Sequence, residues 1–153
     1  MEFKLTSPAF SNGAQIPSQY TCDGDNISPF LVIHGPPPHC KSLALIMADL
    51  DAPERDAVHW VLWNINPEVP EIREHSAPHG SAAGLNSAGR PGYRGPCPDT
   101  GIHRYLLRLF ALDIKLKLAD GATREELERA MEQHILATAE LGCSYQRSNE
   151  APV

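Results

Sequence analysis

The chain has 153 residues, 42% of them hydrophobic and 21% charged, which is the composition of one folded globular domain and not of a disordered or fibrous chain. Its formal net charge of −6 and its lack of a Lys/Arg cluster argue against nucleic-acid binding, which needs a basic face. No apolar run reaches the roughly 18 residues of a membrane span, and the first residues, MEFKLTSPAF, do not resemble a secretion signal. We therefore expect residues 1–153 to form a single domain in the cytoplasm.

Short apolar runs between turn clusters predict strands at residues 3–5, 30–33, 42–48, 59–65 and 104–114. The run SLALIMA at residues 42–48 is continuously apolar, as in a strand buried on both faces. The run HWVLWNI at residues 59–65 is rich in aromatic and β-branched residues. Many of the 14 prolines and 11 glycines lie in residues 67–101, which we expect to be mostly loop.

One segment has the pattern of a helix. Thr123 and Glu126 have the spacing of a capping box, and apolar residues follow at helical intervals, so we predict a helix over residues 123–141 that ends before Gly142. Several strands and a single helix favour a mainly β protein, an antiparallel β-sandwich with helical trim. A βαβ architecture would need more helices than this sequence contains.

Polar, titratable residues stand at the ends of three predicted strands. Asp49 and Asp51 follow the strand at residues 42–48, His59 opens the next strand, and His103 opens the strand at residues 104–114. If the first two strands form a hairpin, Asp49 and His59 lie close together. Tyr105 shares a strand face with His103, whereas Arg104 points to the other face, where we expect a structural ion pair.

The stretch GPCPDTGIHRY, residues 95–105, is stiffened by prolines just before His103. Backbone N–H groups of Gly95 and its neighbours, together with two histidines, would suit a small oxyanion such as phosphate. A carboxylate beside a histidine would raise the pKa of that histidine and favour its charged form. The same Asp and His residues could instead bind a divalent metal, because both types are common metal ligands.

The four cysteines, Cys22, Cys40, Cys97 and Cys143, form no C-x-x-C pair. In a reducing compartment we expect all of them to be free thiols, with a Cys22–Cys97 bridge as the alternative. We do not expect Cys97 to be a catalytic nucleophile, because prolines flank it where a helix N-terminus would be needed to lower its pKa.

Three motifs in order, SLALIMADLDAP, VHWVLWNI and GPCPDTGIHRYLLRLFALD, resemble the phosphatidylethanolamine-binding protein family, which includes the Raf kinase inhibitor proteins. The stretches TCDGDNISP and HILATAELGCSYQR extend the resemblance to the short bacterial and archaeal branch. The resemblance implies a two-sheet antiparallel sandwich of Greek-key type with an anion pocket at one end. The positions that match the pocket of the family are Asp49, Asp51, His59, Gly95, His103 and Tyr105. Bacterial relatives tend to form homodimers, so we expect one here.

This sequence also departs from the family. Leu50 stands where proline usually follows the first motif aspartate, which removes a fixed φ angle and could change the loop around Asp49. The connection from Pro53 to His59 is shorter than is typical, and the chain ends without the extra C-terminal helix of eukaryotic relatives.

The function expected on this basis is non-catalytic binding of a phosphate-type anion or a phospholipid headgroup, without a cofactor. One alternative is a regulator that docks on another protein, as the kinase-inhibiting relatives do. Another is a hydrolase or metalloenzyme that uses Asp49, His59 and His103. Metal analysis would separate the enzyme from the binding protein, and a pull-down would address the regulator.

Overall fold

The structure, a computed structural model, describes residues 2–53 and 57–147. Its elements follow in the order β1 (Lys4–Thr6), the 3-10 helix η1 (Ser18–Tyr20), β2 (Leu31–His34), β3 (Ser42–Asp49), β4 (Val58–Ile65), β5 (Glu71–Ile72), β6 (Ala82–Ala83), β7 (His103–Leu112), α1 (Arg124–Met131) and β8 (Ile135–Tyr145). The expected strands are all present within two residues at each end, and residues 67–101 contain only the short β5 and β6.

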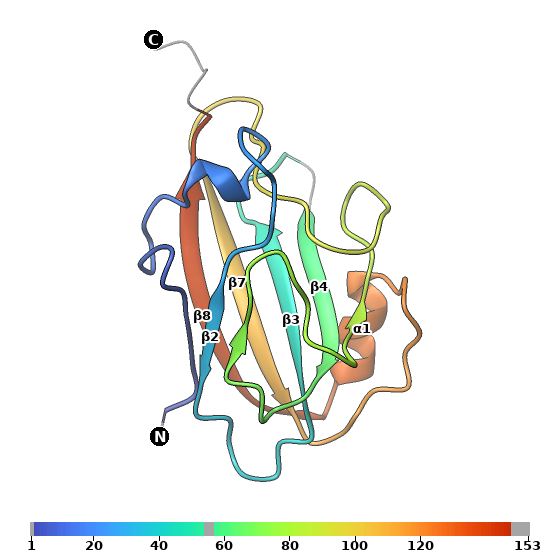
Figure 1. The fold of residues 1–153 in the computed structure, drawn as a ribbon. Helices are drawn as coiled ribbons and strands as arrows, with labels where there is room; N and C mark the ends of the chain where they lie inside the picture. The colour runs from blue at the N-terminus through green and yellow to red at the C-terminus, as the bar shows by residue number, and fades with distance from the viewer. Residues whose placement is uncertain (1, 54–56, 148–153) are drawn as a thin grey trace.

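The strands form two antiparallel sheets. The larger sheet has the order β6-β4-β3-β7-β8 and the smaller has the order β1-β2-β5. β3 lies at the centre of the larger sheet, side by side with β4 and β7 (Figure 1). This central position explains its continuous apolar sequence, because both of its faces are buried. The mainly β, two-sheet fold is as predicted.

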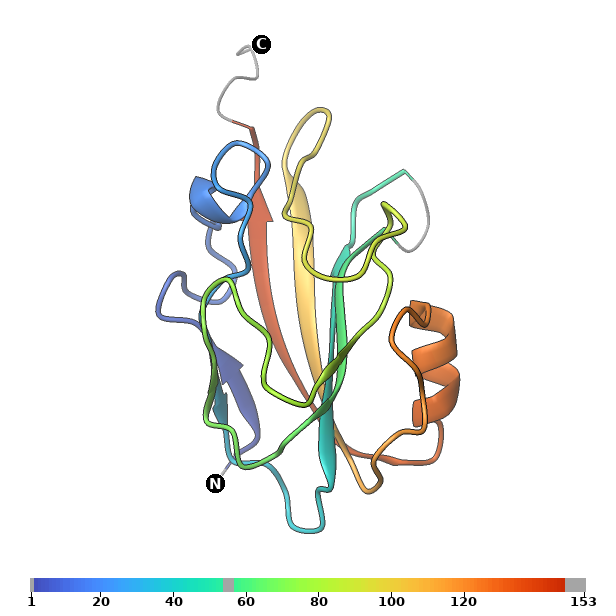
Figure 2. The ribbon, with the colours of Figure 1, turned by 45° about the vertical axis from the view of Figure 1, so that its right-hand side comes forward.

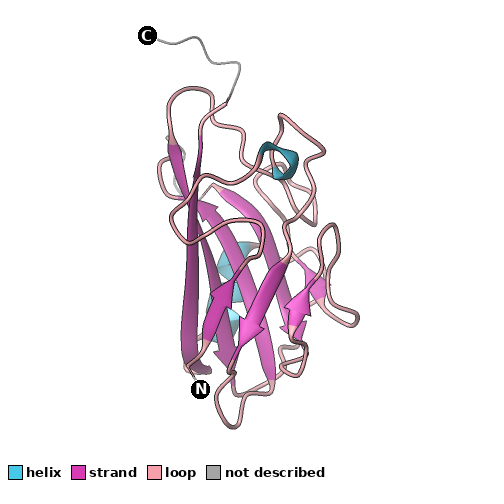
Figure 3. Ribbon diagram, turned by 60° about the vertical axis from the view of Figure 1, so that its left-hand side comes forward, coloured by secondary structure: helices cyan, strands magenta, loops and turns pink. Residues whose placement is uncertain are grey.

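Two hydrophobic cores hold three layers together. Side chains such as Leu45, Leu62 and Leu107 fill the space between the two sheets. Ala44, Trp63 and Leu127 belong to a second core, on the face of the larger sheet that α1 covers. Figure 2 shows α1 on one side of the larger sheet and the smaller sheet on the other, and Figure 3 shows the same layers with α1 behind the strands.

The helix prediction was right at its start and wrong at its end. Thr123 and Glu126 make both hydrogen bonds of the capping box, but α1 ends at Met131. Gln133 then takes a left-handed φ of 66°, and residues predicted to be helical continue as β8. β8 pairs with β7 along most of its length and buries Ala139, Leu141 and Cys143 at every second position. Sheet pairing and burial therefore override the helical propensity of this segment.

The prediction of four free thiols was also wrong. Cys22 and Cys97 form a disulfide across a sequence separation of 75 residues, whereas Cys40 and Cys143 are free. The loops that carry the two bridged residues meet at one end of the sandwich, with a Cα–Cα distance of 5.4 Å that suits a disulfide. The expectation rested on a reducing compartment, and disulfides are favoured in oxidising compartments and in hyperthermophile proteins.

Within the two described ranges, no helix is long and apolar enough to cross a membrane. The region after residue 147 and part of the connection from Pro53 to His59 lie outside the described residues.

Candidate functional site

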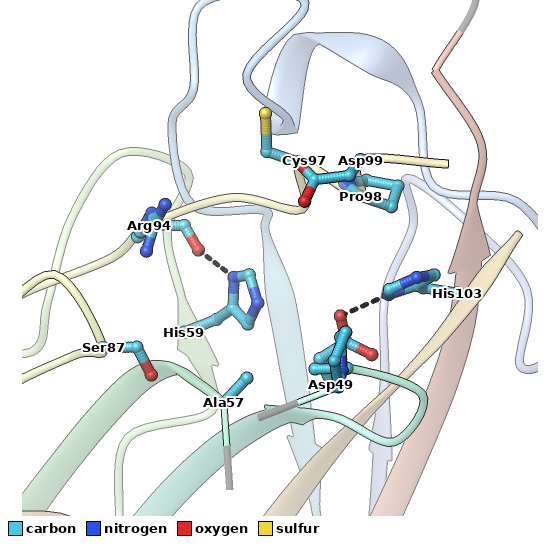
Figure 4. Close-up of a pocket in the computed structure, with 11 residues that line it drawn as sticks. Asp49, Ala57, His59, Ser87, Arg94, Cys97, Pro98, Asp99 and His103 are labelled. Carbon is cyan, nitrogen blue, oxygen red and sulfur yellow. Dashed lines mark hydrogen bonds and ion pairs between the residues drawn. The ribbon is translucent and has the colours of Figure 1, made fainter. Parts of the chain in front are cut away.

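A cavity of about 350 Å³ lies at the end of the sandwich where β3 ends and β4 and β7 begin (Figure 4). We call it the histidine cavity. It is lined by Asp49, Ala52, Pro53, Ala57, His59, Ser87, Arg94, Cys97, Pro98, Asp99 and His103. Residues 94–99, which we call the wall loop, form one side of it. Three of the predicted site residues, Asp49, His59 and His103, thus come together from three neighbouring strands.

Asp49 holds His103 in place. Antiparallel pairing of β3 with β7 sets Asp49 opposite Tyr105, so its carboxylate reaches the nearby His103. The Nδ1 atom of His103 lies 2.7 Å from Oδ2 of Asp49, and the other carboxylate oxygen accepts the Asp51 N–H at 2.8 Å. Only 6% of the Asp49 side chain and 14% of the His103 side chain is exposed. With Nδ1 engaged, Nε2 is the ring nitrogen of His103 that remains for a ligand.

The replacement of proline by Leu50 has a structural consequence here. The Leu50 N–H donates a hydrogen bond to the carbonyl of Arg104 at 2.8 Å, a bond that proline could not make. The Leu50 side chain is exposed. The residue therefore adds a backbone link between the loop after β3 and the start of β7, beside the Asp49–His103 pair.

His59 is fixed by a different partner. Its Nδ1 lies 2.6 Å from the carbonyl oxygen of Arg94, and its side chain is buried. A carbonyl can only accept, so Nδ1 carries the proton, and in the neutral ring Nε2 is a hydrogen-bond acceptor. In Figure 4 this second ring nitrogen faces the interior of the cavity.

Burial is the main reason why the pKa of His59 is lowered from its usual value of 6.5. The hydrogen bond to Arg94 and the charge of Asp49 oppose this effect, and the charge of Arg94 adds to it. Asp49 does act on His59 in the direction expected of a nearby carboxylate, but desolvation of the charged ring outweighs this attraction, so the net change in the pKa of His59 is downward.

Tyr105 lies behind the two histidines and does not line the cavity. Its ring meets that of His59 edge-on with centroids 5.2 Å apart, and it is 6.4 Å from the ring of His103. Its buried hydroxyl has no hydrogen bond of good geometry among the described residues. Burial and the negative charge of Asp49 raise the pKa of this phenol, so it stays protonated. Tyr105 therefore packs against the ring of His59 and lies near the ring of His103.

Gly95 supports the wall loop from behind the cavity. Its N–H donates to Oδ1 of Asn26 at 2.8 Å, so the expectation that this N–H faces an anion was wrong. A Cβ at this position would overlap the carbonyl oxygen of Tyr20. Glycine is therefore required for the wall loop to pack against the segment that follows η1, to which the disulfide also ties it.

Asp51 points away from the cavity. Its carboxylate accepts two hydrogen bonds from the Arg104 guanidinium, at 2.8 and 2.9 Å, and one from the Arg104 N–H at 2.8 Å. These bonds lower the pKa of Asp51 from 3.8 to about 2. The predicted ion pair of Arg104 is confirmed. Its partner is Asp51, which the sequence analysis had counted among the pocket residues.

Sequence reasoning missed Ser87, Arg94 and Asp99. Ser87 accepts the Val58 N–H at 2.6 Å and so anchors the start of β4, while Arg94 and Asp99 bring opposite charges to the cavity. Arg94 immediately precedes the GPCP stretch, and this position in the sequence could have identified it as part of the loop that lines the cavity. Ser87 gave none, because its approach to β4 depends on contacts between distant segments.

In the described part of the chain, no group of three or more His, Cys, Asp or Glu side chains is arranged to hold a metal ion.

Comparisons with known proteins agree with this architecture. The sequence profile of the phosphatidylethanolamine-binding protein family matches residues 6–146. A UPF0098 protein of Methanothermobacter thermautotrophicus is 48% identical over 148 residues, which cover 94% of this chain and 98% of that protein. A UPF0098 protein of Chlamydia pneumoniae is 42% identical over 150 residues, or 95% and 99% of the two chains.

Two solved structures have the same fold. A protein of Chlamydia trachomatis described as a phosphatidylethanolamine-binding protein homologue superposes with a TM-score of 0.92 at 41% identity, covering 95% of this chain and 98% of that one. YbcL of Escherichia coli, described as a member of the mammalian family, has a TM-score of 0.90 at 28% identity and covers 97% and 100%. By the match of the family profile and by these relatives, the chain belongs to the phosphatidylethanolamine-binding protein family.

Proposed function

We propose that this protein is a non-catalytic binding protein whose histidine cavity takes a small phosphate-type anion, either free or as part of a headgroup. The observation that carries the proposal is the convergence of His59, His103 and Arg94 on one cavity of about 350 Å³. Each histidine is held at Nδ1 by an acceptor, so Nε2 is left for a ligand. Such fixed side chains bind a small ligand without the cost of ordering them.

The balance of charge also supports an anion. Arg94, and His103 in its protonated form, supply positive charge, and the negative charge of Asp49 is engaged by His103 and the Asp51 N–H. Asp99 is exposed at the edge of the cavity, where a cationic group attached to the phosphate could approach it. Cys97 is held in the disulfide and offers no thiolate nucleophile, which fits binding without catalysis.

Calorimetric titration with inorganic phosphate, comparing the wild type with His103→Ala, tests the proposal. A hydrogen bond to a charged group is worth roughly 1.5–3 kcal/mol, so His103→Ala should weaken binding by about ten-fold or more. His134→Ala is the matched control, because His134 pairs with Asp113 near the opposite end of β7. Equal phosphate affinity in the wild type and in His103→Ala would remove His103 from the site.

A further inference from the structure

The orientation of His59 bears on which anions the histidine cavity accepts. Its Nδ1–H donates to the Arg94 carbonyl, so the neutral ring offers the cavity a lone pair on Nε2 and no proton. A fully deprotonated oxyanion would place an acceptor oxygen against this acceptor nitrogen. An anion that carries its own proton would instead donate an O–H···N hydrogen bond.

We propose that the histidine cavity selects protonated phosphates, meaning inorganic phosphate and protonated phosphomonoesters, over sulfate and phosphodiesters, and that His59 is the residue that makes this distinction. The proposal rests on the proposed function and narrows its ligand class. Inorganic phosphate keeps a P–OH group throughout the neutral pH range. Sulfate and phosphodiesters carry no proton there, so they can bind well only after His59 itself takes up a proton.

The surroundings of His59 favour its neutral form. Tyr105 on β7 packs edge-on against the ring and stays protonated, and Arg94 adds positive charge from the wall loop. Asp49 on β3 attracts a proton to the ring, but its carboxylate is already paired with His103. Asp99 also lines the cavity and is exposed to solvent. Burial outweighs these attractions and lowers the pKa of His59.

His103 also contributes to the selectivity between phosphate and sulfate. In its protonated form it donates from Nε2, because Nδ1 is held by Asp49. A bound phosphate would then accept from His103 and donate to His59, and this pattern matches a singly protonated phosphate. Sulfate would accept the hydrogen bond from His103, but it has no proton to donate to Nε2 of His59. A sulfate oxygen and this nitrogen, both acceptors, would then face each other. An unsatisfied buried hydrogen-bonding group corresponds to a loss of about ten-fold or more in affinity.

The test compares inorganic phosphate with sulfate, and phosphoethanolamine with glycerophosphoethanolamine, by calorimetry of the full chain near neutral pH and at a series of lower pH values, because the pKa of His59 lies below the ordinary histidine value of ~6.5. We expect inorganic phosphate to bind about ten-fold or more tightly than sulfate near neutral pH, and the gap to narrow on acidification as His59 becomes charged. Buffers of different ionisation enthalpy should reveal proton uptake with sulfate. The diester should behave like sulfate. Phosphoethanolamine has a second phosphate pKa of about 6, so it is mostly unprotonated at neutral pH and should bind there with uptake of a proton onto its phosphate, which the diester cannot do. This difference separates a free phosphomonoester from an intact lipid headgroup.

His59→Phe keeps a flat ring against Tyr105 and removes the acceptor, so the preference for phosphate over sulfate should fall close to one. His134→Phe, the same change far from the cavity, should keep the preference of the wild type, and circular dichroism should show that both variants are folded. Equal binding of phosphate and sulfate by the wild type, or an unchanged preference in His59→Phe, would overturn this inference and leave the proposed function standing. If the wild type bound none of the four ligands, the result would contradict both this inference and the proposed function.

Discussion

At the scale of single residues, the site depends on how two similar side chains are held. His59 and His103 each use Nδ1 in a hydrogen bond, but one partner is a neutral carbonyl and the other is a carboxylate. Both strand ends could be located from the sequence because apolar runs stop there. The hydrogen-bond partners of the two histidines could not be predicted in this way. The position of the Arg94 carbonyl beside His59, for example, depends on the path of a long loop.

The lowered pKa of His59 predicts how stability depends on pH. The unfolded chain takes up a proton at this residue near pH ~6.5, whereas the folded protein does so only at lower pH. Stability from this group is therefore complete above about pH 6.5 and declines as the pH falls below that value. Urea unfolding at several pH values should show a smaller acid loss for His59→Phe than for the wild type. Parallel profiles for the two proteins would contradict the burial argument.

Asp49 and Asp51 offer a paired comparison within one loop. Asp49→Asn should weaken phosphate binding several-fold, because the amide holds the His103 ring less firmly than the carboxylate does, although the lost negative charge offsets part of this effect. Asp51→Asn should leave phosphate affinity within about two-fold, because Asp51 binds Arg104 outside the cavity. Calorimetry measures both. A larger loss of affinity for Asp51→Asn than for Asp49→Asn would reverse these assignments.

At the scale of elements, the sequence predicted the positions of the strands better than it predicted which segments pair or pack together. The run at residues 42–48 could be recognised as a buried strand because its apolar side chains serve both cores. The end of α1 could not be recognised, because the residues after Met131 suit a helix until β7 provides a strand to pair with. The wall loop was expected to shape a pocket, but its attachment to the segment after η1 through Asn26 and Cys22 depends on tertiary contacts.

The wall loop should tolerate no side chain at Gly95. In Gly95→Ala the added methyl group would overlap the Tyr20 carbonyl, which is backbone and cannot rotate away. We expect a loss of roughly 1–3 kcal/mol in unfolding free energy and weaker phosphate binding. Gly142→Ala is the control, because its Cβ would lie 3.5 Å from the nearest atom, Oδ1 of Asn12. Chemical denaturation of both variants measures the difference, and equal stability would argue against the tight packing described here.

At the scale of the whole molecule, the two-sheet fold was predictable and the disulfide was not. Composition and strand spacing indicate a β-sandwich because few other arrangements bury so many short apolar runs. The state of the cysteines was predicted from the expected compartment, and sequence alone does not show that Cys22 and Cys97 face each other across the cavity end. Their bridge joins the first part of the chain to the wall loop.

The disulfide should make a large contribution to stability. Closing a loop of 75 residues restricts the unfolded chain by about 4 kcal/mol in the chain-entropy account. The Cys22→Ser/Cys97→Ser double variant should therefore have an unfolding free energy lower by roughly 2–4 kcal/mol than the oxidised wild type. Cys40→Ser, which leaves the bridge intact, should change it much less. If the double variant were as stable as the oxidised wild type, the bridge would not constrain the unfolded chain.

The central claim is that a phosphate-type anion binds between His59 and His103. Imidazole NMR spectra recorded during titration with inorganic phosphate test this claim most directly, because they report each histidine separately. The signals of His59 and His103 should shift together and saturate with a single dissociation constant, while the signal of His134 stays in place. If the His59 and His103 signals do not respond, or shift no more than that of His134, the anion does not bind in the histidine cavity.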